Sequence, residues 1–150
     1  MDNVTISRLK AGDPGVADYL KMRCAMWDVP DAVNRSEVEQ ILADADDWAV
    51  FVACGAEGRC VGFLEAWLRE YAEGTSSSPV GYIEGWYVEE EYRCHGTGRL
   101  LVEAAEDWAR SRGCTEMASD SQIDNVGGIR AHLHLGYREV ERIVCFLKQL

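Results

Sequence analysis

The chain has 150 residues, 47% of them hydrophobic and 27% charged, which is typical of one globular domain with a sizeable core. A formal net charge of −11, from 26 acidic and 15 basic residues, makes DNA, RNA and anionic membranes poor partners. The same charge suits a cationic substrate. The length of the chain predicts a single domain over residues 1–150. No basic N-terminal region leads into an apolar stretch, so we expect no signal peptide and a cytoplasmic protein.

The first half of the chain predicts a strand, two helices and a hairpin. Pro14 fits the first turn of a helix, and residues 36–39 (Ser-Glu-Val-Glu) have the form of a capping box. Gly55 and Gly58 mark a hairpin turn between two apolar runs. The expected elements are a strand over 4–9, helices over 13–27 and from 36 onward, and strands over 48–54 and 60–67.

The second half predicts alternating strands and helices. Apolar residues recur at helical spacing after Gly98, and Gly113 ends that helix. Its expected buried face comprises Leu100, Leu101, Ala104, Ala105, Trp108 and Ala109. The expected elements are a loop over 70–79, a strand over 82–88, a helix over 98–112, a strand over 115–119, a helix over 125–134, and a closing hairpin of strands over 138–141 and 143–148. This order predicts an α/β fold with a mixed, mostly antiparallel sheet and flanking helices.

The most informative stretch, residues 91–99, reads Glu-Tyr-Arg-Cys-His-Gly-Thr-Gly-Arg. It lies between a strand and a helix, an order that points unpaired backbone N–H groups at one spot before the helix N-terminus. That spot suits a phosphate or pyrophosphate, since Gly96 and Gly98 admit close approach and Arg93 and Arg99 add charge. The spacing matches neither the dinucleotide fingerprint nor the P-loop. An ordinary turn that needs glycine is the alternative.

Six cysteines are scattered through the sequence without a C-x-x-C pair. This distribution predicts free thiols in a reducing compartment, with no disulfide framework and no metal site. Cys94 lies inside the glycine loop beside His95, but neighbours in sequence are seldom oriented for nucleophilic catalysis. The six are Cys24, Cys54, Cys60, Cys94, Cys114 and Cys145.

The sequence pattern Arg93-x-x-Gly96-x-Gly98 resembles the acyl-coenzyme A loop of the GCN5-related N-acetyltransferase (GNAT) superfamily, whose order of strands and helices is also similar. In that fold a bulged fourth strand splays from the fifth, and acyl-CoA lies in the cleft between them. From about Trp48 onward the chain further resembles the aminoglycoside 6′-N-acetyltransferases. The segments that carry this resemblance are Met26-Trp27 and residues 67–71, 74–80, 84–88, 91–93, 113–120 and 135–137.

The resemblance implies transfer of the acetyl group of acetyl-CoA to the 6′-amine of aminoglycosides within a ternary complex, which confers antibiotic resistance. It also implies a homodimer to which the C-terminal strands contribute. The residues expected to bind acetyl-CoA are Trp86, Tyr87, Val88, Arg93, Cys94, His95, Gly96, Thr97, Gly98, Arg99 and Asn125.

Two carboxylates are the expected catalytic residues. Glu84 stands in an otherwise apolar or aromatic strand, where an acid is costly unless it is paired or faces a cleft. Asp120 follows the predicted strand over 115–119 and is the best candidate for the general base. By resemblance both contact the antibiotic, together with Trp27, Tyr71 and Glu141. A solvated strand residue for Glu84, a turn or capping residue for Asp120, and a core residue for Trp27 are the alternatives.

The general acid stays open. Many members of the superfamily place a tyrosine four residues before the glycine of the Leu-Gly-aromatic turn, and here that position is His132. Histidine can donate a proton, but a structural role fits equally well. Tyr137 follows the glycine and is expected to be packed, and departure of a free thiolate is the third option.

Two other functions remain in view. The same fold could acetylate another cationic amine, such as a polyamine, a small amine or a protein N-terminus. It could also be a coenzyme A-binding module without catalysis. The intact glycine loop argues against loss of coenzyme binding, and the retained Glu84, Asp120 and Glu141 argue against loss of catalysis.

Overall fold

The computed structural model describes residues 4–150. These residues form a five-stranded sheet in the order β1-β2-β3-β4-β5, in which all neighbours are antiparallel except the parallel pair β4–β5. The predicted mixed, mostly antiparallel α/β fold is therefore confirmed. The elements are β1 (Thr5–Arg8), α1 (Val16–Trp27), α2 (Asp31–Ala43), β2 (Trp48–Cys54), β3 (Cys60–Arg69), β4 (Val80–Val88), the 3₁₀ turn η1 (Glu90–Tyr92), α3 (Thr97–Ser111), β5 (Met117–Ser119) and α4 (Val126–His134).

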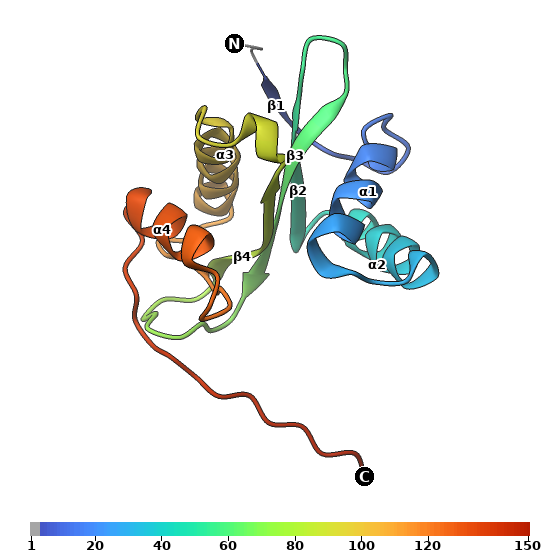
Figure 1. Cartoon of the computed structure of the whole chain (residues 1–150). Helices are drawn as coiled ribbons and strands as arrows, with labels where there is room; N and C mark the ends of the chain where they lie inside the picture. Colours follow the sequence, from blue (N-terminus) through green and yellow to red (C-terminus); the bar gives the residue numbers. More distant parts are fainter. Residues whose placement is uncertain (1–3) are drawn as a thin grey trace.

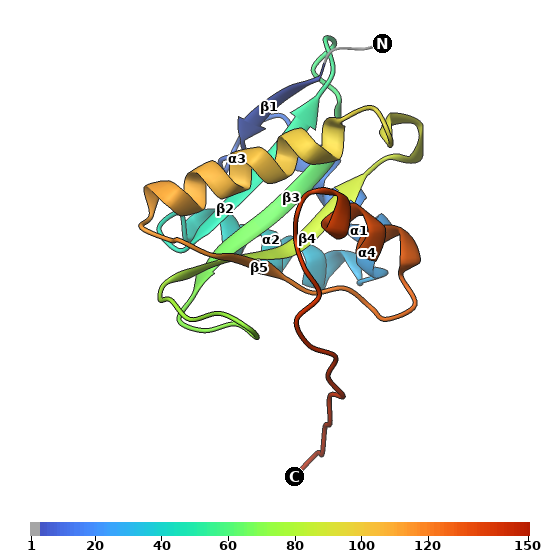
Figure 2. The same cartoon turned by 90° about the vertical axis from the view of Figure 1, so that its left-hand side faces the viewer.

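The sheet is covered on both faces, with α1 and α2 on one side and α3 and α4 on the other (Figure 1). Strands β2 and β3 are buried almost throughout, which explains their continuous apolar sequences. Helix α3 crosses the sheet (Figure 2) and buries a stripe of side chains at spacings of three and four residues. That stripe contains Leu101 and Val102, whereas Leu100, expected in the buried face, is exposed.

Both N-terminal helices begin at residues other than those expected. Helix α1 starts at Val16, so Pro14 lies in the preceding turn and not in the helix. Helix α2 starts at Asp31, and the expected capping box beginning at Ser36 is wrong because this serine lies in mid-helix. The Nδ2 of Asn34 donates to the carbonyl of Leu20 at 2.9 Å, a contact between helices that no local pattern encodes.

The prediction of six free thiols is wrong for two cysteines. Cys54 and Cys60 form a disulfide across the β2–β3 hairpin. These two residues oppose each other in the register of the strands, so strand pairing brings them together and no spacing motif announces the bridge. The remaining four cysteines are free.

The expected closing hairpin is absent from the described chain. After α4 the backbone runs past the loop between β3 and β4 and away from the sheet as an extended tail (Figures 1 and 2). Residues 138–150 have no regular structure and are exposed. The apolar side chains of this tail are in contact with solvent: Phe146 is 92% exposed and Leu147 is 93% exposed. No helix within residues 4–150 is both long and apolar enough to cross a membrane.

Candidate active site

The glycine loop forms an open helix N-terminus. Gly96 is the residue that precedes α3, and its φ of 88° is a left-handed conformation that side chains rarely adopt. A Cβ at Gly96 would have no heavy atom within 4 Å, so the space in front of it is free. No side chain among residues 4–150 caps α3, which leaves the N–H groups of its first turn, beginning at Thr97, available to an anion.

Gly98 also has a role in packing. A Cβ at this position would lie 2.9 Å from the ring of Trp86, so glycine is needed for the packing of α3 on β4. The ring of Trp86 is thereby held under the first turn of the helix. This contact fixes the distance between the free N-terminus of α3 and the last residues of β4.

The remaining loop residues are exposed, and two arginines frame them. The Nε of Arg93 donates to the carbonyl of Val88 at 2.7 Å, which ties the loop to the end of β4. A guanidinium nitrogen of Arg99 lies 3.4 Å from Nε2 of His134 in α4. Cys94 has a φ of 63°, and within the described chain no hydrogen bond joins it to His95. The arrangement gives no support to a Cys94 nucleophile.

Strand β4 carries a bulge at Glu84. In the ladder with β3, Glu65 pairs with Gly85 and Ala66 pairs with Ile83, so Glu84 has no partner. The bulge turns this carboxylate to the surface between buried neighbours. On the other edge, β5 pairs with β4 only as far as Ile83 and Ser119. From Glu84 to Val88 that edge of β4 has no strand partner within residues 4–150, so the two strands part at the bulge.

Glu84 is held by two side chains of β3. It accepts a hydrogen bond of 2.9 Å from the indole N–H of Trp67 and forms an ion pair of 3.5 Å with Arg69. Burial, and then the negative charge of Asp120, raise the pKa of Tyr82 to about 12, and Glu84 adds to the same effect. The parallel register ends at Ile83 and Ser119, so the next residues, Glu84 and Asp120, follow at neighbouring positions of the two strands where β4 and β5 part.

Trp27, at the end of α1, lies directly over the bulge. A Cβ built on Gly85 would overlap its ring, and the guanidinium of Arg23 lies 4.9 Å from the ring centroid. Trp27 is partly buried and packs against the core cluster that contains Phe63, so the alternative of a core residue has support. Its ring lies against Gly85, the residue that follows Glu84.

Beneath Trp27 lies a buried polar group that the sequence reasoning missed. Glu65 is 1% exposed, accepts a hydrogen bond from the hydroxyl of Tyr19, and lies 3.0 Å from Nε of Arg23. Burial raises the pKa of Glu65 to about 7, against the opposing effect of the Arg23 guanidinium. The sequence contained a signal for this buried group, because Glu65 is the single acidic residue within the apolar sequence of β3.

The loop over residues 70–79 is anchored to β5 by a residue that sequence reasoning also missed. Glu116 accepts hydrogen bonds of 2.8 Å from the backbone N–H groups of Ser76 and Ser77, and one of 2.5 Å from the Ser77 hydroxyl. These donors, the hydroxyl first, lower the pKa of Glu116. Tyr71 stands at the start of this loop and is 65% exposed, free to contact a ligand.

Asn125 and Glu141, the remaining expected site residues, lie in different surroundings. Asn125 caps α4, since its Oδ1 accepts from the N–H of Gly128 at 3.0 Å. Glu141 lies in the exposed tail and is not brought together with Glu84 and Asp120 within one chain.

The rings of His132 and Tyr137 pack against each other with their centroids 5.6 Å apart, and the Tyr137 hydroxyl donates to Glu106 at 3.0 Å, so Tyr137 is a packed residue.

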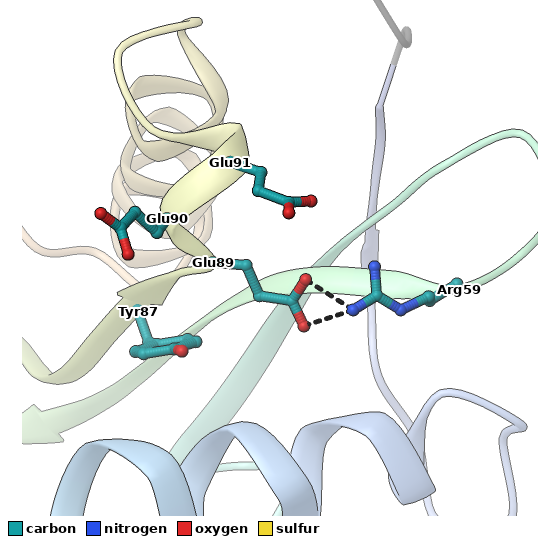
Figure 3. A pocket seen from close by; sticks show the side chains of 5 residues that line it. All are labelled: Arg59, Tyr87, Glu89, Glu90 and Glu91. Carbon is teal, nitrogen blue, oxygen red and sulfur yellow. Dashed lines mark hydrogen bonds and ion pairs between the residues drawn. The ribbon is translucent and has the colours of Figure 1, made fainter.

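A hollow of about 620 Å³ lies beside the glycine loop, on the side of the sheet that faces α1 (Figure 3). Its lining consists of Arg59, Tyr87, Glu89, Glu90 and Glu91. Arg59 is already paired with Glu89 at 2.6 Å, so the remaining charge of the lining is negative. This hollow is therefore unsuited to a phosphate. Within residues 4–150 no group of three or more potential ligand side chains could hold a metal ion.

The sequence profile of the acetyltransferase (GNAT) family matches residues 18–137. The chain is a GNAT acetyltransferase. It belongs to the branch of the aminoglycoside N(6′)-acetyltransferases: it is 46% identical to the type 1 enzyme of Stenotrophomonas maltophilia over 132 residues, 87% of this chain and 84% of the relative. The type 1 enzyme of Klebsiella aerogenes is 44% identical over 139 residues, 89% and 90% of the two chains.

Solved structures of this family have the same fold. AAC(6′)-Ih from Acinetobacter baumannii superposes with a TM-score of 0.91 at 34% identity, over 99% of each chain. AAC(6′)-Iy, solved with the bisubstrate analogue CoA-S-monomethyl-acetylneamine, superposes with a TM-score of 0.91 at 32% identity, again over 99% of each chain. The predicted family and the predicted class of enzyme are confirmed.

Proposed function

We propose that this acetyltransferase transfers the acetyl group of acetyl-CoA to the 6′-amine of aminoglycoside antibiotics by direct transfer in a ternary complex, and thereby confers resistance. The observation that carries the proposal is the pair of carboxylates, Glu84 on its bulge and Asp120 after β5, where the strands part. Two anionic groups beside an open strand edge suit a polycationic substrate. The aminoglycoside N(6′)-acetyltransferases to which the chain is similar support the same choice.

The coenzyme side is assigned to the glycine loop and the free edge of β4. The uncapped start of α3 and the open left-handed Gly96 fit a pyrophosphate, with Arg93 and Arg99 close by. Trp86, Tyr87 and Val88 offer backbone groups to the pantetheine amides and an N–H to the thioester carbonyl. The list of proposed contacts is completed by Cys94, His95, Thr97, Gly98 and Asn125. Acetyl-CoA, when bound, supplies a thioester activated for attack by an amine.

The substrate side is assigned to the two carboxylates and the aromatic wall. Asp120 holds the 6′-ammonium group and then accepts its proton, because only the neutral amine attacks a carbonyl carbon. Glu84 binds a second cationic group and is oriented by Trp67 and Arg69. Trp27 and Tyr71 offer ring faces to the sugar rings. Holding both substrates in this geometry supplies much of the rate.

We also propose that the chain works as one domain over residues 1–150 and as a homodimer. The tail is extended and exposes Ile143, Val144, Phe146 and Leu147, while the outer edge of β5 lacks a partner within residues 4–150. Thirteen extended residues reach about 40 Å, far enough to pair with a second copy. Such pairing would bury these side chains and carry Glu141 to a substrate site. Since acetyl-CoA is a cytoplasmic metabolite, we place the enzyme in the cytoplasm.

The test is thiol release from acetyl-CoA with a panel of cationic amines. Two aminoglycosides that differ only in an amine or a hydroxyl at the 6′ position form the matched pair. We expect turnover with the 6′-amine, none with the 6′-hydroxyl, and weak turnover with polyamines. Preference for a polyamine, or equal turnover of the matched pair, would contradict the proposed substrate. Tight coenzyme binding without release from any amine would show a module without catalysis.

A further inference from the structure

The structure places Ser119 and His132 in a hydrogen-bonded pair at the point where β4 and β5 part. Nε2 of His132 lies 2.9 Å from Oγ of Ser119, and Nδ1 of the same ring lies 2.7 Å from the carbonyl of Gly128. Ser119 is the last residue of β5 to pair with β4, opposite Ile83, and it directly precedes Asp120. None of the roles assigned above uses this pair.

The contacts of His132 fix which nitrogen carries the proton. A carbonyl oxygen can only accept, so Nδ1 carries a proton in every state of the ring. In the neutral ring Nε2 is therefore an acceptor, and the Ser119 hydroxyl donates to it. In the imidazolium Nε2–H donates to Ser119, and the hydroxyl proton must turn elsewhere. The two other acceptors near Oγ, the carbonyls of Ile83 and Asp120, are both 3.4 Å away, too far to hold it firmly.

The surroundings of the ring keep this arrangement in place. Trp86 of β4 meets it edge-on at 5.3 Å and Tyr137 meets it edge-on at 5.6 Å. Burial, and then the charge of Glu106 on α3, raise the pKa of Tyr137, so this phenol stays neutral and does not exchange protons with the ring. The nearest charged side chain along the strand is Asp120, and Glu84 follows Ile83 on β4. His132 thus sits between two aromatic rings with Ser119 as its route to the open strand edge.

We propose that the Ser119 hydroxyl is the proton donor to the departing thiolate, and that His132 is a positioning residue that supplies its replacement proton. This inference rests on the proposed acetyl transfer. The amine nitrogen forms a bond to the acetyl carbon, and the bond from that carbon to sulfur breaks. The sulfur takes the proton from Oγ of Ser119 while Oγ takes the proton from Nε2. The reaction ends with a thiol, an intact serine and a neutral His132, which regains a proton from solvent.

The donor role predicts a pH dependence that a structural role does not. Only the imidazolium directs the hydroxyl proton away from the ring, so wild type should lose this help when the ring is neutral. Ser119→Ala should lower kcat about a hundredfold on the acidic side, with KM for acetyl-CoA nearly unchanged. The ratio of wild-type to Ser119→Ala kcat should shrink as pH rises. A ratio that is the same at every pH would overturn the proposal.

Four further variants sharpen the test. His132→Gln keeps a side chain that can donate to the Gly128 carbonyl but cannot titrate, so it should resemble Ser119→Ala, and the double variant should be no worse than either. Ser119→Thr retains the hydroxyl and should recover turnover. Ser121→Ala removes a nearby exposed hydroxyl that donates to the carbonyl of Gln122 and does not bond to His132 within residues 4–150, and it should behave as wild type. Additive losses in the double variant would contradict a relay.

A measurement without turnover separates this inference from the proposed function. Nitrogen-15 NMR of the imidazole should show the Nδ1–H tautomer in the neutral ring of wild type, and a mixture of tautomers would overturn the relay. Should wild type acetylate an amine other than an aminoglycoside, the same kinetic ratios apply to that amine and only the proposed substrate fails. Should wild type release no thiol with any amine, both proposals fail.

Discussion

The ring of Trp27 fills the space beside the Cα of Gly85, one residue after the bulged Glu84. A helix end and a strand that lie 58 positions apart in the sequence thus meet without room for one methyl group. The guanidinium of Arg23 lies over the same ring, 4.9 Å from its centroid. The position of the indole therefore depends on the absence of a side chain at Gly85, directly after the bulge.

Gly85→Ala should displace Trp27 and raise KM for the aminoglycoside about tenfold, with little change in acetyl-CoA affinity. The added methyl should also lower the free energy of unfolding by about 1–3 kcal/mol, the usual cost of overpacking. Steady-state kinetics and urea denaturation measure the two effects. The double variant Trp27→Phe/Gly85→Ala, with a smaller ring, should regain stability. An unchanged KM in Gly85→Ala would remove Trp27 from the substrate site.

Gly96→Glu should abolish measurable acetyl-CoA binding, because the new side chain brings a negative charge to the open N-terminus of α3. The matched control is Gly58→Glu in the β2–β3 turn. Gly58 has a φ of 81° and equally free space around a Cβ, so the backbone strain is the same while the anion site is untouched. Titration calorimetry compares the two variants. Equal affinities would show that the glycine loop does not bind the coenzyme.

Asp120→Asn keeps the volume of the side chain and removes its charge, so folding and acetyl-CoA binding should survive. Turnover of an aminoglycoside should fall about a hundredfold or more, the usual scale for losing a general base. The loss should shrink as pH rises, because more of the amine is then already neutral. Glu84→Gln is the comparison: a larger defect in that variant would indicate a base acting through water. Near-normal turnover of Asp120→Asn from about pH 6 to 9 would leave Asp120 as a turn residue.

Glu65 should make stability fall as pH rises. Its folded-state pKa of about 7 lies above its ordinary value, so between these two values the folded protein binds a proton that the unfolded chain releases. The contribution of Glu65 to the free energy of unfolding is therefore complete below its ordinary pKa and is lost as pH approaches 7. This contribution is at most about 3 kcal/mol. Melting temperatures across this range should decline in wild type and stay flatter in Glu65→Gln. Parallel curves would show that Glu65 keeps its charge when folded.

The tail should hold the proposed dimer together. Val144→Glu/Phe146→Glu places two charges on the exposed apolar segment and should convert the dimer to a monomer, whereas Gln149→Glu adds charge beside that segment and should not. Light scattering at micromolar concentration distinguishes the species. A wild-type protein that is monomeric under these conditions would refute the dimer and leave the place of Glu141 unexplained.

The sequence predicted those elements whose signals are local. The apolar runs of β2 and β3, the helical stripe of α3 and the glycines before it all depend on residues close together in the chain. The capping box at Ser36 misled because α2 already begins at Asp31, directly after Pro30, so this serine lies in mid-helix. The closing hairpin failed because the apolar residues of the tail, over 138–150, pair with no strand within residues 4–150, although the outer edge of β5 is open.

The residues of the candidate site were likewise predictable only where their signal is local in the sequence. Glu84 stood out because an acid is unusual in an apolar strand, and the bulge explains how the fold accommodates it. Glu116 could not be found, since its role consists of bonds to Ser76 and Ser77, about 40 positions away. Ser119 was equally invisible, because its significance comes from a ring on α4 that only the fold brings to it. Single residues with unusual surroundings were predictable, and pairs made by the fold were not.

The hydrogen bond from Trp67 to Glu84 has an optical consequence. The ring of Trp67 stacks on that of Trp48 at 5.3 Å with an angle of 6° between their planes, so the two indoles form a coupled pair of chromophores. A cationic ligand that competes for the Glu84 carboxylate would loosen the N–H bond that holds one member of the pair. The near-ultraviolet circular dichroism and the tryptophan emission of the unmodified protein would then report occupancy of the substrate site directly, before any acetyl group is transferred.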